Sequence, residues 1–312
     1  MTAAVCGSFA FDTIMVFQDK FANHILPEQV HILNVSFQVP EMRREFGGCA
    51  GNIAYNLKLL GGDVLPIGTV GHDFTAYHAW LDRCEIDCRY VTEIPDNYTA
   101  QAFIITDLAD NQITAFHPGA MNCSQQNSLL EIPNLKMGMI SPDGRDGMII
   151  HAKELAQMGV PFFFDPGQGT PLFSGKELLS FIDQATWMTV NDYEWKMIQE
   201  RTGLTIEEAA KKLQALIITK GGDGSLIYHD NQCVEIPSVP IKSVKDPTGC
   251  GDAYRGGLLF GLQKGVDWAT SGRIASLMGA IKIEHSGTQN HHFTFDEFQT
   301  RFKENFGYDL AF

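Results

Sequence analysis

The second half of the chain alternates short apolar runs with segments of helical periodicity, and this order constrains the fold more than any other feature. From about residue 137 the sequence reads MGMIS, GMIIHAKELAQMG, PFFFD, KELLSFIDQ, ATWMTV, DYEWKMIQERTG, IEEAAKKLQ and ALIITK. Strands that alternate with helices in this way form a parallel sheet with helices on both faces. Earlier in the chain, NIAYNLKLLGG followed by VLPIGTVG fits the same sheet. We therefore predict an α/β protein whose central, mostly parallel sheet is flanked by helices.

Three other stretches lack helices between their strands. SFAFDTIMVFQ, HILNVSFQVPEM and TAQAFIITDLADNQITAF are rich in aromatic and β-branched residues, and the third contains a predicted hairpin turn at Asp110 and Asn111. They indicate a small, partly antiparallel β-sheet, contributed by about residues 12–45 and 97–118, that serves as a lid over a cleft. The alternative is that this sheet only ornaments the core. Because no linker marks a boundary, we expect residues 1–312 to form a single domain.

The composition argues against nucleic-acid and membrane partners. The formal net charge of −14 repels phosphate backbones and anionic lipid, and no apolar run approaches the roughly 18 residues that span a bilayer. The N-terminal segment lacks the pattern of a signal peptide, and the seven cysteines are scattered and odd in number. We therefore expect a reduced, cytoplasmic protein. Adjacent histidines rarely chelate one metal together, so His291 and His292 are predicted to lie on the surface.

The segment TGCGD stands directly before an apolar pattern of helical spacing. Gly249, Cys250 and Gly251 would present successive backbone N–H groups at the helix start, where the helix dipole also favours an anion. Asp252 adds a carboxylate beside the same pocket. Phosphoryl transfer to an alcohol needs N–H groups that stabilise charge on the phosphoryl and a base that takes the hydroxyl proton. The alternative is a glycine-rich helix start with an aspartate cap.

A second glycine-rich segment, EFGGCAGNIAYNLKLLGG, also stands directly before a helix. It leaves Gly47 and Gly48 with exposed backbone and places Asn52 on the helix, which suits a ligand that carries several hydroxyls. Asp12 follows the first apolar strand, near the strand end where ligands bind in open α/β sheets. A carboxylate there would accept two adjacent hydroxyls, as in a ribose. The alternatives are a cap for Asn52 and a turn for Asp12.

The segments FGGCAGN and DPTGCGDAYRGG together resemble the two signatures of the ribokinase-like (PfkB) carbohydrate and nucleoside kinases. NDYE and ITKGGDGS resemble the N-x-x-E segment and the nucleotide loop of that family, so the resemblance covers nearly the whole chain. It implies a ribokinase-like fold with a β-sheet lid, and ATP-dependent phosphorylation of an alcohol. By matching positions, it implies Asp252 as catalytic base and Gly249, Cys250 and Gly251 as anion hole. It implies Asp12, Gly48 and Asn52, beside the exposed backbone of Gly47, as ligands of the sugar. It further implies Asn191 as a phosphate ligand and Glu194 as a ligand of Mg²⁺ through water; Thr219, Gly221, Gly222 and Gly224 as the ATP site; and Asp246 and Thr248 as ligands of K⁺.

Two residues of the chain depart from the sequence pattern of that family. Cys250 stands where the family usually has alanine or glycine, and Cys49 stands where ribokinase-type members often carry lysine. Together with FFFDPGQ, the signatures are most similar to the bacterial adenosine and nucleoside kinase branch. A purine requires a flat apolar slot, because aromatic faces stack on it. The lid stretches contain the candidates Phe9, Phe11, Phe37, Phe103 and Phe116.

We therefore expect a kinase that uses ATP and Mg²⁺ to phosphorylate the 5′-hydroxyl of adenosine or a related nucleoside. One alternative is the same chemistry on a free sugar such as ribose or fructose, and another is a non-catalytic nucleoside-binding protein on this scaffold. Retention of Asp252 argues against the second alternative. Arg255, one helical turn past this base, would either meet a phosphate or face solvent. The edge strands of the lid would be exposed unless a homodimer covers them.

Overall fold

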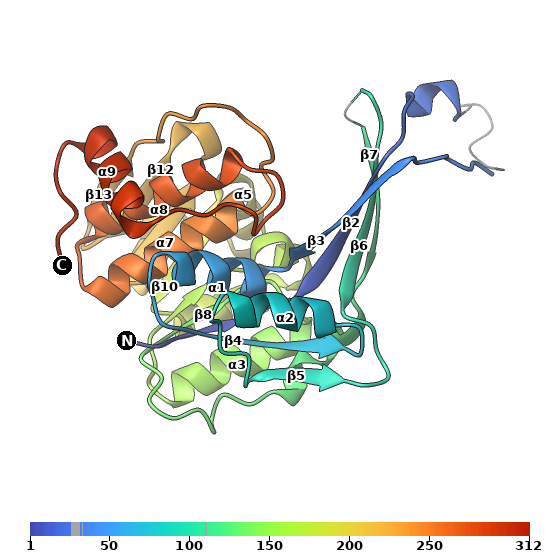
Figure 1. Cartoon of the computed structure of the whole chain (residues 1–312). Helices are drawn as coiled ribbons and strands as arrows, with labels where there is room; N and C mark the ends of the chain where they lie inside the picture. The colour runs from blue at the N-terminus through green and yellow to red at the C-terminus, as the bar shows by residue number, and fades with distance from the viewer. Residues whose placement is uncertain (26–31, 33, 110) are drawn as a thin grey trace.

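The computed structural model describes residues 1–25, 32, 34–109 and 111–312, and it confirms an α/β body built on one large sheet (Figure 1). The strands of this nine-stranded sheet follow the order β13 (Gln232–Ile236), β12 (Ser225–His229), β11 (Ala215–Thr219), β10 (Trp187–Asn191), β9 (Phe162–Phe164), β8 (Met137–Ile140), β1 (Ala3–Cys6), β4 (Val64–Gly71) and β5 (Val91–Ile94). All neighbours from β11 to β5 are parallel, whereas β12 and β13 pair antiparallel. The sheet is therefore mostly parallel, as predicted.

Helices cover both faces of this sheet. Side chains alternate between the two faces along each strand, so each strand contributes apolar side chains to a core on either face. In β9, Phe163 joins one buried core, while Phe162 and Phe164 join the other. The first core receives side chains from α1 (Cys49–Leu59), α2 (Thr75–Arg83), α7 (Cys250–Lys264), α8 (Trp268–Ile283) and α9 (Phe295–Phe306). The second receives them from α3 (Arg145–Gln157), α4 (Gly175–Gln184), α5 (Asp192–Thr202) and α6 (Ile206–Lys212). Among the described residues, no helix is both long and apolar enough to cross a bilayer.

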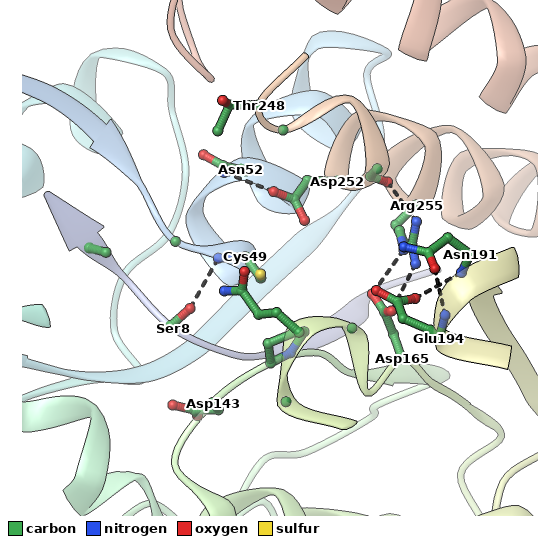
Figure 2. Close-up of a pocket in the computed structure, with 18 of the residues that line it drawn as sticks. Ser8, Cys49, Asn52, Asp143, Asp165, Asn191, Glu194, Thr248, Asp252 and Arg255 are labelled. Carbon is green, nitrogen blue, oxygen red and sulfur yellow. Dashed lines mark hydrogen bonds and ion pairs between the residues drawn. The ribbon is translucent and has the colours of Figure 1, made fainter. Parts of the chain in front are cut away.

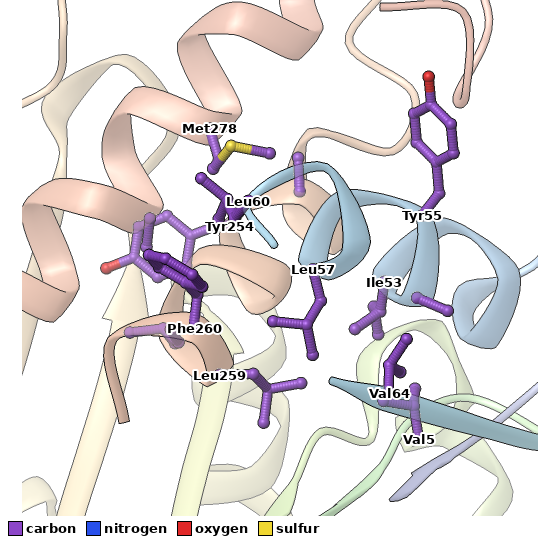
Figure 3. Packing of buried hydrophobic residues seen from close by; sticks show 14 of the residues in the cluster. Val5, Ile53, Tyr55, Leu57, Leu60, Val64, Tyr254, Leu259, Phe260 and Met278 are labelled. Carbon is purple, nitrogen blue, oxygen red and sulfur yellow. The ribbon is translucent and has the colours of Figure 1, made fainter. Parts of the chain in front are cut away.

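The first core fixes the two helices whose N-terminal ends face the ligand cavity described below. Figure 3 shows Ile53 and Leu57 of α1 beside Val5 of β1, Val64 of β4 and Leu259 of α7, and all five side chains are buried. Burial of one such side chain contributes about 1.5–3 kcal/mol. Packing of this kind therefore holds α1 and α7 in a fixed relation to each other and to the sheet.

A second, four-stranded sheet projects from the body (Figure 1). Its strands follow the order β3 (Glu41–Gly47), β2 (Ala10–Val16), β6 (Ala100–Thr106) and β7 (Gln112–His117). The β2–β6 pair is parallel, and the β2–β3 and β6–β7 pairs are antiparallel. The predicted small lid sheet and its β6–β7 hairpin are thus confirmed, although the predicted turn residue Asp110 lies outside the described residues.

The strand predicted in HILNVSFQVPEM is only partly correct, because it begins near the end of that segment. Residues 34–40 belong to no strand, and β3 begins at Glu41. Phe37 instead packs against Phe17 and Phe21, with ring centroids 4.8 and 5.0 Å apart. Phe37 therefore packs in an aromatic cluster and takes no part in strand pairing. Short 3-10 helices lie at Phe21–Asn23, Gly119–Gln126, Gly167–Leu172 and Gly221–Asp223.

Candidate active site

A cavity of about 910 Å³ combines residues of the lid sheet with residues at the carboxyl ends of the central strands. Asp143, Asp165 and Asn191, which follow or end β8, β9 and β10, line it as expected for an open α/β sheet. Figure 2 shows these side chains around the same space as Asn52 and Asp252. The predicted site residues that line the cavity are Asp12, Gly48, Asn52, Asn191, Glu194, Thr219, Gly221, Thr248, Gly249, Gly251 and Asp252.

Asp252 lies in the first turn of α7, at the helix end that faces the cavity. Gly249 caps this helix with a φ of 79°, a left-handed conformation that favours glycine. Asn52 Nδ2 donates a hydrogen bond of 2.8 Å to Asp252 Oδ2 (Figure 2). Burial raises the pKa of Asp252 from 3.8 to about 6, although the Asn52 hydrogen bond and the Arg255 guanidinium oppose this rise. The carboxylate is therefore mostly ionised at neutral pH and able to accept a proton.

The three residues predicted for the anion hole differ in their surroundings. Gly249 and Gly251 line the cavity, whereas Cys250 does not. The Cys250 N–H donates to the Pro247 carbonyl at 3.2 Å, and the Cys250 Sγ lies 3.9 Å from the Asp246 carbonyl oxygen. At the start of α7, the backbone of Gly249 and Gly251 therefore borders the cavity. Cys250, which stands between them, instead contacts the preceding residues Asp246 and Pro247.

The residues predicted to hold sugar hydroxyls come from β2, β3 and α1. Asp12 lies within the lid strand β2, not at the carboxyl end of the first central strand, so its predicted placement is wrong in detail. It still lines the cavity, and burial together with Asp246 and Glu45 raises its pKa to about 6. Gly47 does not line the cavity but packs on Asp12, since a Cβ at this position would lie 2.6 Å from Asp12 Oδ2.

The residues predicted to bind nucleotide lie at the ends of β10 and β11. Asn191 caps α5 reciprocally with Glu194: Asn191 Oδ1 accepts the Glu194 N–H at 2.7 Å, and Glu194 Oε2 accepts the Asn191 N–H at 2.8 Å. Burial, together with nearby Asp165, raises the pKa of Glu194. Gly221 lines the cavity, but Gly222 and Gly224 do not. The loop predicted to bind the nucleotide therefore contributes only its first part to the cavity wall.

Two carboxylates of the cavity escaped the sequence analysis. Asp165 forms a two-point ion pair with Arg255, with 2.9 Å from Nε to Oδ2 and 2.9 Å from Nη2 to Oδ1 (Figure 2). Arg255 is thus buried in an ion pair, so the predicted solvent-facing alternative is wrong. Burial raises the pKa of Asp143, the second carboxylate, to about 8. Asp165 directly follows β9 and Asp143 lies three residues after the end of β8, so both occupy the strand-end position at which ligands bind in open α/β sheets.

The prediction for His291 is wrong, and that for His292 agrees with the structure. His291 is fully buried, and its Nε2 lies 2.8 Å from Asn56 Oδ1 of α1. Burial lowers its pKa to about 3, so the ring is neutral and serves the core. His292 is exposed. The two adjacent side chains thus differ in their surroundings, since one is buried in the core and the other faces solvent.

Of the five phenylalanines considered for a base slot, Phe116 lines the cavity. Phe9 and Phe11 are buried in the first core, and Phe37 belongs to the aromatic cluster near Phe21. Phe103 is 41% exposed but does not border the cavity. The apolar part of the cavity wall that comes from the lid therefore consists of Ala10 of β2, Ala102 of β6 and Phe116 of β7, with Thr114 beside Phe116.

Comparisons with known proteins identify relatives over almost the full length of the chain. The model of the pfkB family carbohydrate kinases matches residues 12–293. The chain is 31% identical over 275 residues to a nucleoside kinase of Methanocaldococcus jannaschii, covering 87% of this chain and 90% of that protein. The structure of Burkholderia thailandensis nucleoside kinase in complex with inosine is similar, with 52% identity, a TM-score of 0.89 and coverage of 98% and 99%. The same enzyme in complex with ADP-inosine gives 54% identity, a TM-score of 0.87 and coverage of 98% and 97%.

Proposed function

Because the chain belongs to the pfkB family of carbohydrate kinases, we propose that it transfers the γ-phosphate of ATP to the 5′-hydroxyl of a nucleoside. The observation that carries this proposal is the position of Asp252, whose carboxylate lies at the glycine-bounded start of α7 in the cavity. The relatives described as nucleoside kinases, and the one bound to inosine, support a nucleoside as acceptor.

In this reaction Asp252 accepts the proton of the attacking hydroxyl while the backbone at Gly249 and Gly251 stabilises the charge on the transferred phosphoryl group. A general base of this kind contributes about 10²–10⁴-fold, and oriented N–H donors contribute on a similar scale. The Asn52 amide holds the carboxylate in place. Asp12, which lies beside Gly47 at the base of the lid, is positioned to accept the ribose hydroxyls.

Mg²⁺ fits this site as an ion held mainly by phosphate oxygens and water. The described residues contain no group of three or more His, Cys, Asp or Glu side chains arranged around one ion. Mg²⁺ commonly binds through one or two carboxylates together with substrate phosphates. Glu194, which keeps one carboxylate oxygen outside the helix cap, would hold the ion through water. When bound, the ion neutralises charge on the phosphates of ATP.

The acceptor that we favour is adenosine or a related purine nucleoside. The inosine complexes of a relative with 52% and 54% identity support a purine base, and Phe116 offers it an aromatic face. The alternative acceptor is a free sugar, since the family model is that of carbohydrate kinases. A free sugar would leave the apolar wall of Ala102 and Phe116 without a partner.

An assay of ADP release with Mg-ATP and a panel of adenosine, inosine, cytidine, ribose and fructose tests the proposal. Turnover on purine nucleosides that is lost in Asp252→Asn supports it. Turnover on sugars alone would assign the sugar-kinase alternative. Saturable nucleoside binding without ADP release would assign a non-catalytic binding protein.

We also propose that both sheets belong to one kinase domain, with the second sheet as its lid, and that two chains pair through the lid. The exposed edge strand β7, with Ile113 43% and Phe116 51% exposed, supports such a homodimer. Light scattering on the purified protein measures the mass of the assembly and tests the pairing.

A further inference from the structure

A fully buried lysine lies beneath the loop that carries the proposed catalytic base. Lys282 belongs to the last turn of α8, and its side chain is 0% exposed. Its Nζ donates to the Asp246 carbonyl at 2.7 Å and to the His285 carbonyl at 3.3 Å, and lies 4.0 Å from Asp246 Oδ1. A buried ammonium is costly unless it is paired and hydrogen-bonded, and these three oxygens supply both requirements.

Asp246 connects this ammonium to the cavity. The residue opens the loop DPTGCGD, and its carboxylate accepts the N–H of Thr248 at 2.9 Å and the N–H of Gly287 at 2.9 Å. Thr248 and Gly249, which follow in the same loop, line the cavity. Lys282 and Asp246 therefore tie the end of α8 and the Gly287 segment to the loop that presents the start of α7.

The K⁺ expected at Asp246 and Thr248 does not fit beside this lysine. The Asp246 carbonyl and the space next to the Asp246 carboxylate are taken by the ammonium. The Asp246 carboxylate also already accepts two backbone N–H groups, which leaves it few lone pairs for an ion. A second cation at this point would be repelled by the first at a distance where buried charges interact strongly.

We propose that the Lys282 ammonium does the work of a bound monovalent cation in this chain, so that phosphoryl transfer is independent of K⁺. Lys282 is then a positioning residue. It neutralises Asp246 and the carbonyls beneath the loop, and so holds Gly249 and Gly251 where they meet the phosphoryl group. This inference rests on the proposed kinase function, but the geometry that carries it belongs to the loop alone.

Two substitutions at Lys282 distinguish the effect of the side-chain charge from the effect of the side-chain volume. Lys282→Met fills the space without a charge, whereas Lys282→Ala opens a cavity of ion size at the same carbonyls. We expect wild-type kcat to change less than about twofold when KCl replaces tetramethylammonium chloride, because no site for the ion is left. We expect both variants to lose about tenfold or more in kcat without K⁺, with K⁺ restoring Lys282→Ala but not Lys282→Met.

Thermal unfolding in the same two salts gives a readout that does not require turnover. An ion that binds only the folded state raises its stability with concentration, so the melting temperature of Lys282→Ala should rise with KCl more than with tetramethylammonium chloride. Lys303→Ala, a change at an exposed lysine, is the control. The melting temperatures of the wild type and of this control should each change by the same amount in KCl as in tetramethylammonium chloride.

Strong activation of the wild type by K⁺ overturns the inference, and this result needs no variant to fold. Normal kcat in Lys282→Ala without K⁺ overturns it as well. A wild type that phosphorylates no acceptor in either salt contradicts the kinase proposal instead, while the melting temperatures still decide whether Lys282 replaces an ion.

Discussion

Asn52 and Asp252 are 200 positions apart in the chain, yet their side chains share a hydrogen bond of 2.8 Å between the first turns of α1 and α7. The Asn52 Oδ1 in turn accepts a hydrogen bond of 3.0 Å from Gln289 Nε2, which fixes the orientation of the amide. The carboxylate at the centre of the proposed chemistry is therefore positioned by two glycine-rich segments acting together.

Replacement of Asp252 by asparagine tests its role as the base. The amide has the shape of the carboxylate but accepts no proton, so kcat should fall by about 10²–10⁴-fold. Dissociation constants for nucleoside, measured by calorimetry, should stay within about threefold of the wild type, because the change leaves the cavity wall intact. A variant with near-normal kcat would contradict the assignment.

The pH profile should report the titration of Asp252. Because only the ionised carboxylate accepts a proton, kcat/KM should rise as pH increases through about 6 and then level off. Asn52→Leu removes a hydrogen bond that lowers this pKa, so the rise should move to higher pH. Asp12 also titrates near pH 6, and Asp12→Asn identifies its share: a rise that persists in this variant belongs to Asp252.

The same titration predicts an effect on stability. The pKa of Asp252 is raised in the folded state, from 3.8 to about 6, so its carboxyl disfavours folding once it is ionised. The neutral Asp252→Asn should therefore match the wild type below pH 3.8 and become more stable, by about 3 kcal/mol, as pH rises from 3.8 through about 6. Urea unfolding at several pH values measures this difference, and a constant difference across that range would refute it.

The ion pair of Asp165 with Arg255 should be essential for stability. Asp165→Asn leaves a buried guanidinium without its counter-charge, which costs about 3–5 kcal/mol in comparable cases. Asp183→Asn, which breaks an exposed pair with Lys212, should cost about 1 kcal/mol or less. Urea unfolding of both variants gives the comparison, and equal losses would mean that the buried pair contributes no more than a surface one.

Phe116 should determine nucleoside affinity. Phe116→Ala removes an aromatic face from the cavity wall, so KM for nucleoside should rise about tenfold while KM for ATP stays unchanged. Phe103→Ala is the matched control, because this exposed residue does not border the cavity.

Hydrogen exchange in the described parts of residues 12–45 and 97–118 should slow when substrate is added, and unchanged exchange would argue against a lid.

The sequence was enough to predict those features of the structure that depend on short stretches of neighbouring residues. The order of apolar runs predicted the parallel sheet. The glycines before two helices predicted backbone that faces a ligand, and of these Gly48, Gly249 and Gly251 line the cavity whereas Gly47 does not. Side-chain pairing across the chain was not predictable. Nothing near Arg255 in the sequence points to Asp165, and nothing near Lys282 points to Asp246. Such partners are set by how the strands assemble, and so is the burial of His291.

The lid sheet and the proposed base are linked through one short piece of backbone. β3 ends at Gly47 and α1 begins at Cys49, so Gly48, with a φ of 87°, is the only residue between a lid strand and the helix that carries Asn52. A change in the position of the lid would reach the helix that carries Asn52, and with it the hydrogen bond to Asp252, through this one residue. We therefore expect closure of the lid to be coupled to the position of Asp252, so that the proposed base is aligned with the acceptor hydroxyl while the lid covers the substrate.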